Sequence, residues 1–154
     1  MNVYRARPNY VPWPPLLLVG LTVAAIALNL IHPLPFEFGG ARMVGAALML
    51  LALGIDLWAM RTLHEAHTTI LPNRRSTHLV THGPFKYSRN PIYVANMMLM
   101  VGMGCFSLNG WFLFLAPIEG LLTHILAVRR EENHLIANFG YQFECYCRKV
   151  RRWV

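Results

Sequence analysis

The chain has 154 residues, enough for one domain, and 55% of them are apolar whereas only 14% are charged. Soluble domains average about 25% charged residues, so this composition excludes an ordinary soluble protein and indicates a polytopic membrane protein. The formal charge of +7 could suggest a nucleic-acid-binding protein. The cations flank apolar runs and do not form one basic face, however, which argues against nucleic acid as a partner.

Two long apolar segments precede the first extended polar stretch. Residues 15–31 carry no charge and follow Trp13, an aromatic residue of the type enriched at membrane interfaces. We predict a first transmembrane helix there and not a cleaved signal peptide, because no clear small-residue cleavage site follows. A short loop over 32–42 leads to a second predicted span over 43–60. Asp56 lies near the end of that span, where it is either hydrated at the surface or a polar contact facing the bundle.

Residues 61–91 form the longest polar segment and are predicted to be a loop that carries functional residues. His64 and His67 have the i, i+3 spacing of metal ligands on a helix, but no third ligand is evident, so we predict no metal site. The odd number of cysteines, three, and the lack of a Cys-x-x-Cys pair argue against a disulfide framework or a zinc site.

A basic and aromatic stretch from His82 to Tyr93 is the strongest candidate for a functional site. Gly83 breaks any helix together with the proline that follows it. Asn90 and Pro91 predict the start of the next helix, with Asn90 as the N-cap and Pro91 as the first residue. Because helix N-termini favour anions, this basic stretch is a suitable place for a negatively charged group to bind.

The apolar region over 92–128 is too long for a single helical crossing of the membrane, because a helix rises ~1.5 Å per residue and the hydrocarbon core is ~30 Å thick. A turn signal over 107–110 divides it. We therefore predict a helical hairpin over 92–106 and 111–128, whose small residues Ala95, Gly102 and Gly104 allow close helix approach.

Glu119 lies midway along the second arm of this hairpin. An ionised carboxylate inside a membrane is costly, so we expect this side chain to be protonated, paired or facing a polar cavity.

The chain becomes charged again at residue 129. Apolar residues then recur at helical spacing, with charged residues on the opposite face. This pattern predicts an amphipathic helix over 129–150, interrupted near Gly140, that lies on the membrane or caps the bundle. The predicted fold is thus all-α, a single domain over residues 1–154 with four transmembrane helices and a C-terminal amphipathic helix.

Charge distribution predicts the orientation of this fold. Four spans would place the N-terminus, the 61–91 loop and the C-terminus on one side of the membrane. All Lys and Arg residues except Arg42 then lie on that side, which the positive-inside rule assigns to the cytoplasm. We expect a protein of the bacterial inner membrane, with both termini and the candidate site in the cytoplasm.

Two segments resemble a family of membrane enzymes, the isoprenylcysteine carboxyl methyltransferases and phospholipid N-methyltransferases. The first segment resembles the cofactor motif of this family, with Asn90 in place of the more common His, through His82-Gly83-Pro84, Tyr87, Arg89-Asn90-Pro91 and Tyr93. The second segment, from the Glu131-Glu132 pair to the Val-Arg-Arg sequence ending at Arg152, is similar to the C-terminal motif of the family. The resemblance covers about residues 60–154.

The resemblance implies an S-adenosylmethionine-dependent methyltransferase that acts on a lipidic or small acceptor and is surrounded by membrane lipids. It implies that Arg89 grips the carboxylate of the cofactor as a planar fork. Glu131 or Glu132 would bind the ammonium group or the ribose hydroxyls, and Arg89 and Glu132 are the predicted catalytic residues. The remaining implied cofactor-binding residues are His82, Gly83, Tyr87, Asn90, Pro91 and Tyr93.

Two other functional classes stay open. One is a membrane reductase that uses NADPH, since sterol reductases share a related C-terminal architecture, and the other is a non-catalytic membrane adaptor. The individual residues also have simpler interpretations: Arg89 as a topology determinant, the tyrosines as interfacial residues, and the Glu pair as a complement to the helix dipole. No residue in the sequence is evident as a general base.

Overall fold

The structure is a computed structural model that describes residues 11–66 and 78–154. Apart from one isolated bridge between Pro35 and Asn109, the regular structure of these residues is helical. The helices are α1 (Trp13–Ile31), α2 (Ala41–Glu65), the 3-10 helix η1 (Gly83–Lys86), α3 (Pro91–Ser107), α4 (Trp111–Thr123), the π-helical turn η2 (His124–Val128), α5 (Arg129–Phe139) and α6 (Tyr141–Lys149).

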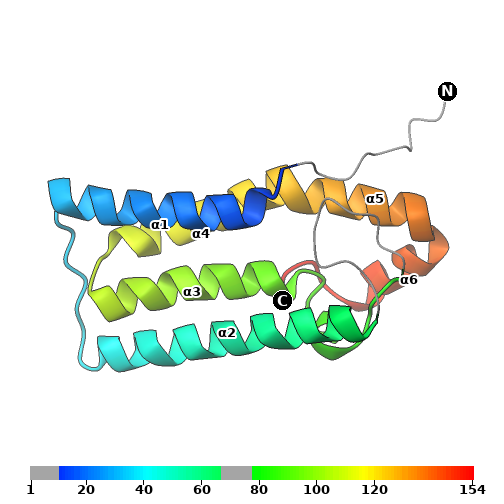
Figure 1. The fold of residues 1–154 in the computed structure, drawn as a ribbon, viewed down its shortest axis with the longest axis horizontal. Helices are drawn as coiled ribbons and strands as arrows, with labels where there is room; N and C mark the ends of the chain where they lie inside the picture. The colour runs from blue at the N-terminus through cyan, green and yellow to red at the C-terminus, as the bar shows by residue number, and fades with distance from the viewer. Residues whose placement is uncertain (1–10, 67–77) are drawn as a thin grey trace.

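Four helices run side by side along the long axis of the molecule (Figure 1). Helix α2 packs on α3, α3 on α4, and α4 on α1. The α1–α2 and α3–α4 connections meet at one end, where the N–H of Gly110 donates to the carbonyl of Leu34 at 2.8 Å. Helices α5, α6 and η1 gather at the opposite end, so the two predicted halves of the functional site lie on the same side of the bundle.

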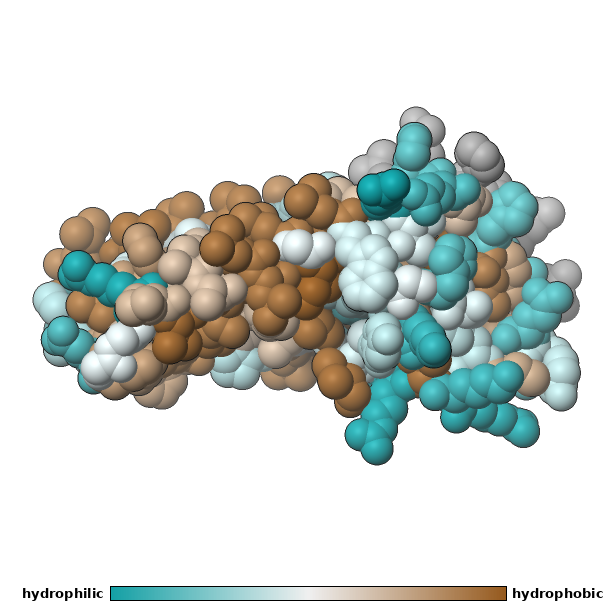
Figure 2. All heavy atoms as spheres, turned by 90° about the horizontal axis from the view of Figure 1, so that it is seen from below, coloured by the Kyte–Doolittle hydropathy of each residue, from teal (hydrophilic) through white to brown (hydrophobic). Residues whose placement is uncertain are grey.

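The helices have the length and surface of a membrane protein. Helices α1 and α2 and the continuous helix Trp111–Phe139 are long and apolar enough to cross a membrane. Large apolar side chains such as Leu30 (81% exposed) and Leu50 (71% exposed) face outward. Figure 2 shows apolar side chains along most of the bundle, with most hydrophilic ones at one end and a smaller group at the other. These features identify an integral membrane protein.

Helix α3 is the short member of the bundle. Its 17 residues extend about 25 Å at 1.5 Å per residue, which is less than the ~30 Å hydrocarbon core. Each of the four predicted spans therefore corresponds to a helix. That all four helices cross the membrane completely stays a prediction.

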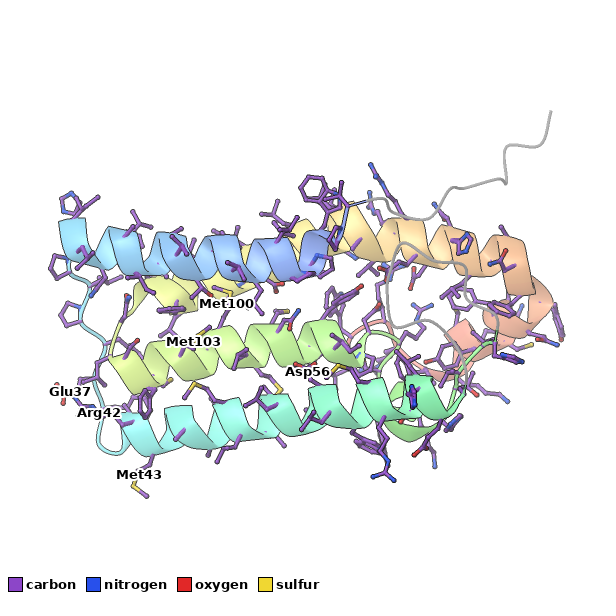
Figure 3. All side chains as sticks on the ribbon, viewed as in Figure 1. Glu37, Arg42, Met43, Asp56, Met100 and Met103 are labelled. Atoms are coloured by element: carbon purple, nitrogen blue, oxygen red, sulfur yellow. The ribbon has the colours of Figure 1, made fainter. Side chains whose placement is uncertain are left out.

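Glycines allow α3 to approach both of its neighbours. A Cβ atom at Gly102 would lie 2.8 Å from Cγ of Met49 on α2, and one at Gly104 would lie 2.8 Å from Cβ of Phe112 on α4. The close helix approach predicted from these glycines is therefore confirmed. On the other side of α3, Met100 is fully buried and points toward α1 and α4 (Figure 3).

Two predicted boundaries differ from the structure. Helix α2 continues to Glu65, beyond the predicted end at residue 60, and Arg61 pairs with Glu65 at 2.8 Å in its last turn. The start of the predicted 61–91 loop is therefore helical. The helix predicted over 129–150 is interrupted at Gly140, as expected, where φ is 48°. Its start differs from the prediction, because α5 continues directly from α4 through η2. His67 and the middle of the loop lie outside the described residues.

Two carboxylates lie within the apolar helices. Glu119 is fully buried, and its Oε1 accepts a hydrogen bond from the Thr123 hydroxyl at 3.0 Å, whereas its Oε2 is buried with no hydrogen-bond partner among the described residues. Asp56 points from α2 toward α3 in Figure 3, which favours the bundle-facing interpretation. Its Oδ1 is nonetheless buried with no hydrogen-bond partner among the described residues.

Candidate functional site

The stretch from His82 to Tyr93 leads into the first turn of α3. Pro91 is the first residue of α3 and Asn90 precedes it, so both predicted positions are confirmed. The capping role predicted for the Asn90 side chain is wrong, because this side chain accepts no hydrogen bond from the first turn of α3. Its Nδ2 donates to the carbonyl of Arg152 at 2.9 Å. The amide therefore fastens a distant segment of the chain to the start of α3.

The segment after α6 runs back across the start of α3. The N–H of Arg89 donates to the carbonyl of Arg151 at 3.0 Å, and on α6 the Tyr146 hydroxyl donates to the carbonyl of Phe85 at 2.6 Å. Burial raises the pKa of Tyr146, so its phenol stays protonated and keeps this hydrogen bond. Backbone and side-chain bonds together hold the two predicted motifs against each other.

Arg89, Glu132 and Arg152 form an ionic cluster at this junction. Arg89 Nη1 lies 3.3 Å from Glu132 Oε1, and both side chains are only 12% exposed. Arg152 grips the same carboxylate with two bonds, Nε to Oε1 at 3.1 Å and Nη2 to Oε2 at 2.6 Å, and these bonds raise the pKa of Arg152. Two guanidinium groups around one carboxylate leave an excess positive charge, which suits an anionic ligand.

The Arg89 side chain makes one further contact and also has one donor without a partner. Its Nη1 also donates to Sγ of Cys147 on α6. Its Nε is buried and has no hydrogen-bond partner within residues 11–66 and 78–154. Beside it, the Tyr93 hydroxyl donates to Glu131 Oε1 at 2.7 Å, so the second carboxylate of the Glu pair is held by the first motif as well.

Two of the predicted site residues lie apart from this cluster. His82 is exposed and precedes η1. Tyr87 is 66% exposed, and its ring centroid lies 6.4 Å from that of Trp58 on α2. The structure therefore brings together Arg89, Asn90, Tyr93 and the Glu pair and leaves His82 and Tyr87 outside this cluster. The cofactor contacts of all these residues stay predictions. Gly83 takes a left-handed φ of 60° at the start of η1, which is consistent with its predicted turn.

An apolar pocket of about 690 Å³ adjoins the cluster. Its volume falls within the ~300–1,000 Å³ that ligand pockets typically have. Helices α3 and α4 form most of its wall, and its lining residues are Leu48, Val94, Met97, Met98, Val101, Pro117, Gly120, Leu121, His124, Trp153 and Val154.

His124 and Trp153 in this lining were not predicted as site residues. The ring centroids of these two residues lie 6.2 Å apart. The sequence offered one signal that His124 is a site residue: it is the single histidine in the apolar run over 111–128. Trp153 follows directly after Arg152, so the chain passes from the ionic cluster into the pocket wall within one residue.

Comparisons with known proteins identify the family of the chain. The chain is 35% identical over 82 residues to the nickel-cobalt-cadmium resistance protein NccN of Alcaligenes xylosoxydans xylosoxydans, an alignment that covers 52% of this chain. It covers only 37% of that relative, so the chain spans little more than a third of the relative's length. No solved structure matches the chain. A family model described as phospholipid methyltransferase matches residues 41–142, about two thirds of the sequence, and the chain therefore belongs to the phospholipid methyltransferase family.

Proposed function

We propose that the protein is an S-adenosylmethionine-dependent methyltransferase that acts on a lipidic or small acceptor at the membrane. The observation that carries this proposal is the 3.3 Å contact between Arg89 and Glu132, which joins the two separated motifs at one buried point. Membership of the phospholipid methyltransferase family supports methyl transfer as the reaction. When bound, S-adenosylmethionine would supply a methyl group on a positively charged sulfur.

The residues of the ionic cluster fit the groups of this cofactor. Arg89 has a buried Nε without a partner in the described part of the chain, and such an unsatisfied donor costs ~1–3 kcal/mol. A carboxylate would satisfy it and complete the planar fork of the guanidinium. Glu131 and Glu132 offer carboxylate oxygens for an ammonium group or for ribose hydroxyls.

The apolar pocket supports a lipidic acceptor. It adjoins the cluster through Trp153 and is lined by helices whose outer surfaces are apolar. A hydrocarbon chain in this pocket would be removed from water, which is favourable by ~25 cal/mol per Å² of apolar surface. Holding the head of such a molecule beside the cofactor is the main way in which an enzyme promotes a methyl transfer.

Calorimetric titration of the purified, detergent-solubilised protein with S-adenosylhomocysteine tests the cofactor. We expect saturable binding that weakens at least tenfold in Arg89→Ala, because charged hydrogen bonds contribute ~1.5–3 kcal/mol. In this variant Glu132 keeps both of its bonds to Arg152, so no unpaired carboxylate remains and the fold is expected to persist.

Arg61→Ala is the matched control, since this arginine is exposed and pairs only with Glu65 at the end of α2 in the described structure. We expect it to bind the ligand as the wild type does. Absence of binding to folded wild-type protein, or equal binding by Arg89→Ala, would contradict the proposal. Binding of NADPH in place of S-adenosylhomocysteine would favour the reductase.

A further inference from the structure

Three side chains that can bind a soft metal ion line the apolar pocket together. They are the imidazole of His124 and the thioethers of Met97 and Met98. Thioether and imidazole ligands suit copper, and thioethers select its monovalent form, whereas hard cations such as Mg²⁺ prefer oxygen ligands. Within the described part of the chain, no acidic side chain lines this pocket. The ligand set that the pocket offers is therefore soft and uncharged.

The sulfur of Met97 lies one helical turn away from His124. A Cβ atom at Gly120 would lie 2.6 Å from Met97 Sδ, so the thioether rests on the bare backbone of α4. The N–H of His124 donates to the carbonyl of Gly120, and Cβ positions four residues apart on a helix are ~5–6 Å apart. Because a methionine has three rotatable bonds, a small movement of Met97 brings its sulfur to an ion on His124.

The imidazole of His124 is incompletely satisfied by the protein. Its Nδ1 is buried and has no hydrogen-bond partner among the described residues. His134 on α5 differs, since its Nε2 pairs with Asn138 at 3.0 Å. Buried polar atoms in native proteins nearly always have a partner, and the χ2 torsion of a histidine varies broadly. The ring of His124 can therefore turn a nitrogen toward an ion in the pocket.

Trp153 places an aromatic ring beside this imidazole. The two ring centroids lie 6.2 Å apart, and both side chains line the pocket. A cation within ~6 Å of an indole centroid is attracted to the face of the ring, and the attraction is strongest away from water. Trp153 can therefore stabilise a positive charge without supplying a negative one.

A single positive charge suits this site better than two. Moving a charge from water into apolar surroundings is costly, and neither a thioether nor a neutral imidazole carries a charge that would offset it. Arg129 and Arg152 also act on the His124 ring electrostatically, which further disfavours a divalent ion.

We propose that His124, Met97 and Met98 bind a soft monovalent metal ion of the Cu(I) or Ag(I) class. Trp153 is the cation–π partner of this ion. The ion keeps its oxidation state, since only dative bonds from nitrogen and sulfur form. The inference goes beyond the proposed function, which requires no metal. A bound ion would occupy the end of the pocket beside the ionic cluster, so it would exclude an acceptor and make the site sensitive to soft metals.

Silver nitrate in chloride-free detergent solution is the probe, because Ag⁺ is a soft monovalent ion that needs no reducing agent. The protein is a full-length variant whose three native cysteines are replaced by serine, since thiols bind Ag⁺ themselves. We expect saturable binding by calorimetry together with quenching of tryptophan fluorescence. Most of the quenching should be lost in Trp153→Phe, although calorimetry should still detect binding in that variant.

Met97→Leu in the same background tests the ligands. The substitution conserves volume and usually costs less than ~1.5 kcal/mol, so the fold is expected to persist. Loss of an outer partner of a metal site already lowers metal affinity ~10–100-fold, so loss of the Met97 sulfur should weaken Ag⁺ binding at least about tenfold. Met103→Leu is the matched control on α3, because Met103 packs on the core with α1 and α4 and lies outside the pocket lining (Figure 3).

The thermal unfolding midpoint gives a second readout. A ligand that binds only the folded state stabilises it, so Ag⁺ should raise the midpoint of the parent and of Met103→Leu more than that of Met97→Leu. His124→Leu should lose Ag⁺ affinity as Met97→Leu does.

Three results would overturn the inference: equal Ag⁺ affinity in Met97→Leu and Met103→Leu, unchanged affinity in His124→Leu, or displacement of Ag⁺ by an equal concentration of Zn²⁺. None of these measurements uses S-adenosylhomocysteine. The metal site and the proposed methyl transfer can therefore fail separately.

Discussion

Arg89 connects three parts of the molecule through its backbone and its side chain. Its N–H bonds the segment after α6, its guanidinium contacts Glu132 on α5, and Nη1 also reaches Cys147 on α6. A lysine could not make this set of contacts, because its ammonium is a point donor and not a planar fork. The cofactor site we propose therefore depends on the shape of Arg89 as much as on its charge.

Tyr93→Phe tests the hydrogen bond between Tyr93 and Glu131, which also joins the two motifs. It removes the 2.7 Å hydrogen bond to Glu131 and leaves a buried carboxylate oxygen unsatisfied, which costs ~1–3 kcal/mol. We expect a lower midpoint of thermal unfolding and weaker binding of S-adenosylhomocysteine, measured by fluorescence and calorimetry. Tyr141→Phe is the control, because this tyrosine is exposed on α6, and it should change neither quantity. An unchanged midpoint of thermal unfolding in Tyr93→Phe would show that this hydrogen bond contributes nothing to stability.

Side-chain chemistry made part of the site predictable. The resemblance to a methyltransferase family implied that Arg89 and Glu132 act together, the charge distribution placed both motifs on one side of the bundle, and the structure brings the two side chains to 3.3 Å. The bond from Asn90 to the Arg152 carbonyl was not predictable, because a backbone acceptor has no signature in the sequence. The role of Asn90 was instead assigned to a local cap, which its residue type favours.

At the scale of helices, α3 is the element on which the bundle is assembled. Its glycines face α2 and α4, so the helix contacts both neighbours at short distance while its N-terminal end carries the first motif. A shift of α3 along or away from α2 would therefore move Arg89 and Tyr93 relative to the Glu pair. Packing in the membrane and geometry in the site are coupled through this helix.

Gly102→Ala tests that coupling. The new Cβ would lie 2.8 Å from Met49 Cγ and 3.0 Å from the Gly45 carbonyl oxygen, and such overpacking costs about 1–3 kcal/mol. We expect a lower unfolding midpoint together with weaker binding of S-adenosylhomocysteine. Gly54→Ala on α2 is the matched control, since no atom lies within 4 Å of its new Cβ; removing a helical glycine there should stabilise the protein slightly. Equal midpoints in the two variants would reject close packing at Gly102.

Hydrophobic periodicity predicted the helices well and their junctions less well. The hairpin predicted over 92–106 and 111–128 corresponds to α3 and to α4 with η2, because the turn residues between them are distinctive. The π-helical turn His124–Val128 was missed, since one unusual turn leaves the pattern of apolar residues almost unchanged. That turn joins α4 to α5 without a break, so the charged start of α5 continues a membrane helix.

The molecule as a whole has one polar end and one apolar body. Figure 2 shows hydrophilic side chains concentrated over the end that carries α5, α6 and η1. The proposed site lies at this end, while the pocket extends into the wall of α3 and α4 below it. This arrangement would let a water-soluble cofactor and a membrane-soluble acceptor reach one site from two phases, which is the geometry that a membrane methyltransferase requires.

The orientation of the whole molecule gives the final prediction. Glu37 and Arg42 lie at the end of the bundle opposite the site (Figure 3), and Arg42 is the single Lys or Arg of the sequence on that side in the predicted topology. The positive-inside rule then places Glu37 outside the cytoplasm. In a variant whose three native cysteines are replaced by serine, Glu37→Cys should react with a membrane-impermeant maleimide in intact bacterial cells.

Glu65→Cys is the matched variant at the other end of α2, where the side chain is exposed beside Arg61. It should stay unlabelled in intact cells and react fully once the membrane is permeabilised, which also shows that the cysteine is accessible. The opposite pattern would place the ionic cluster outside the cytoplasm, away from any cytoplasmic supply of S-adenosylmethionine. The proposed function would then need a different cofactor, so this labelling tests the orientation and the proposed chemistry together.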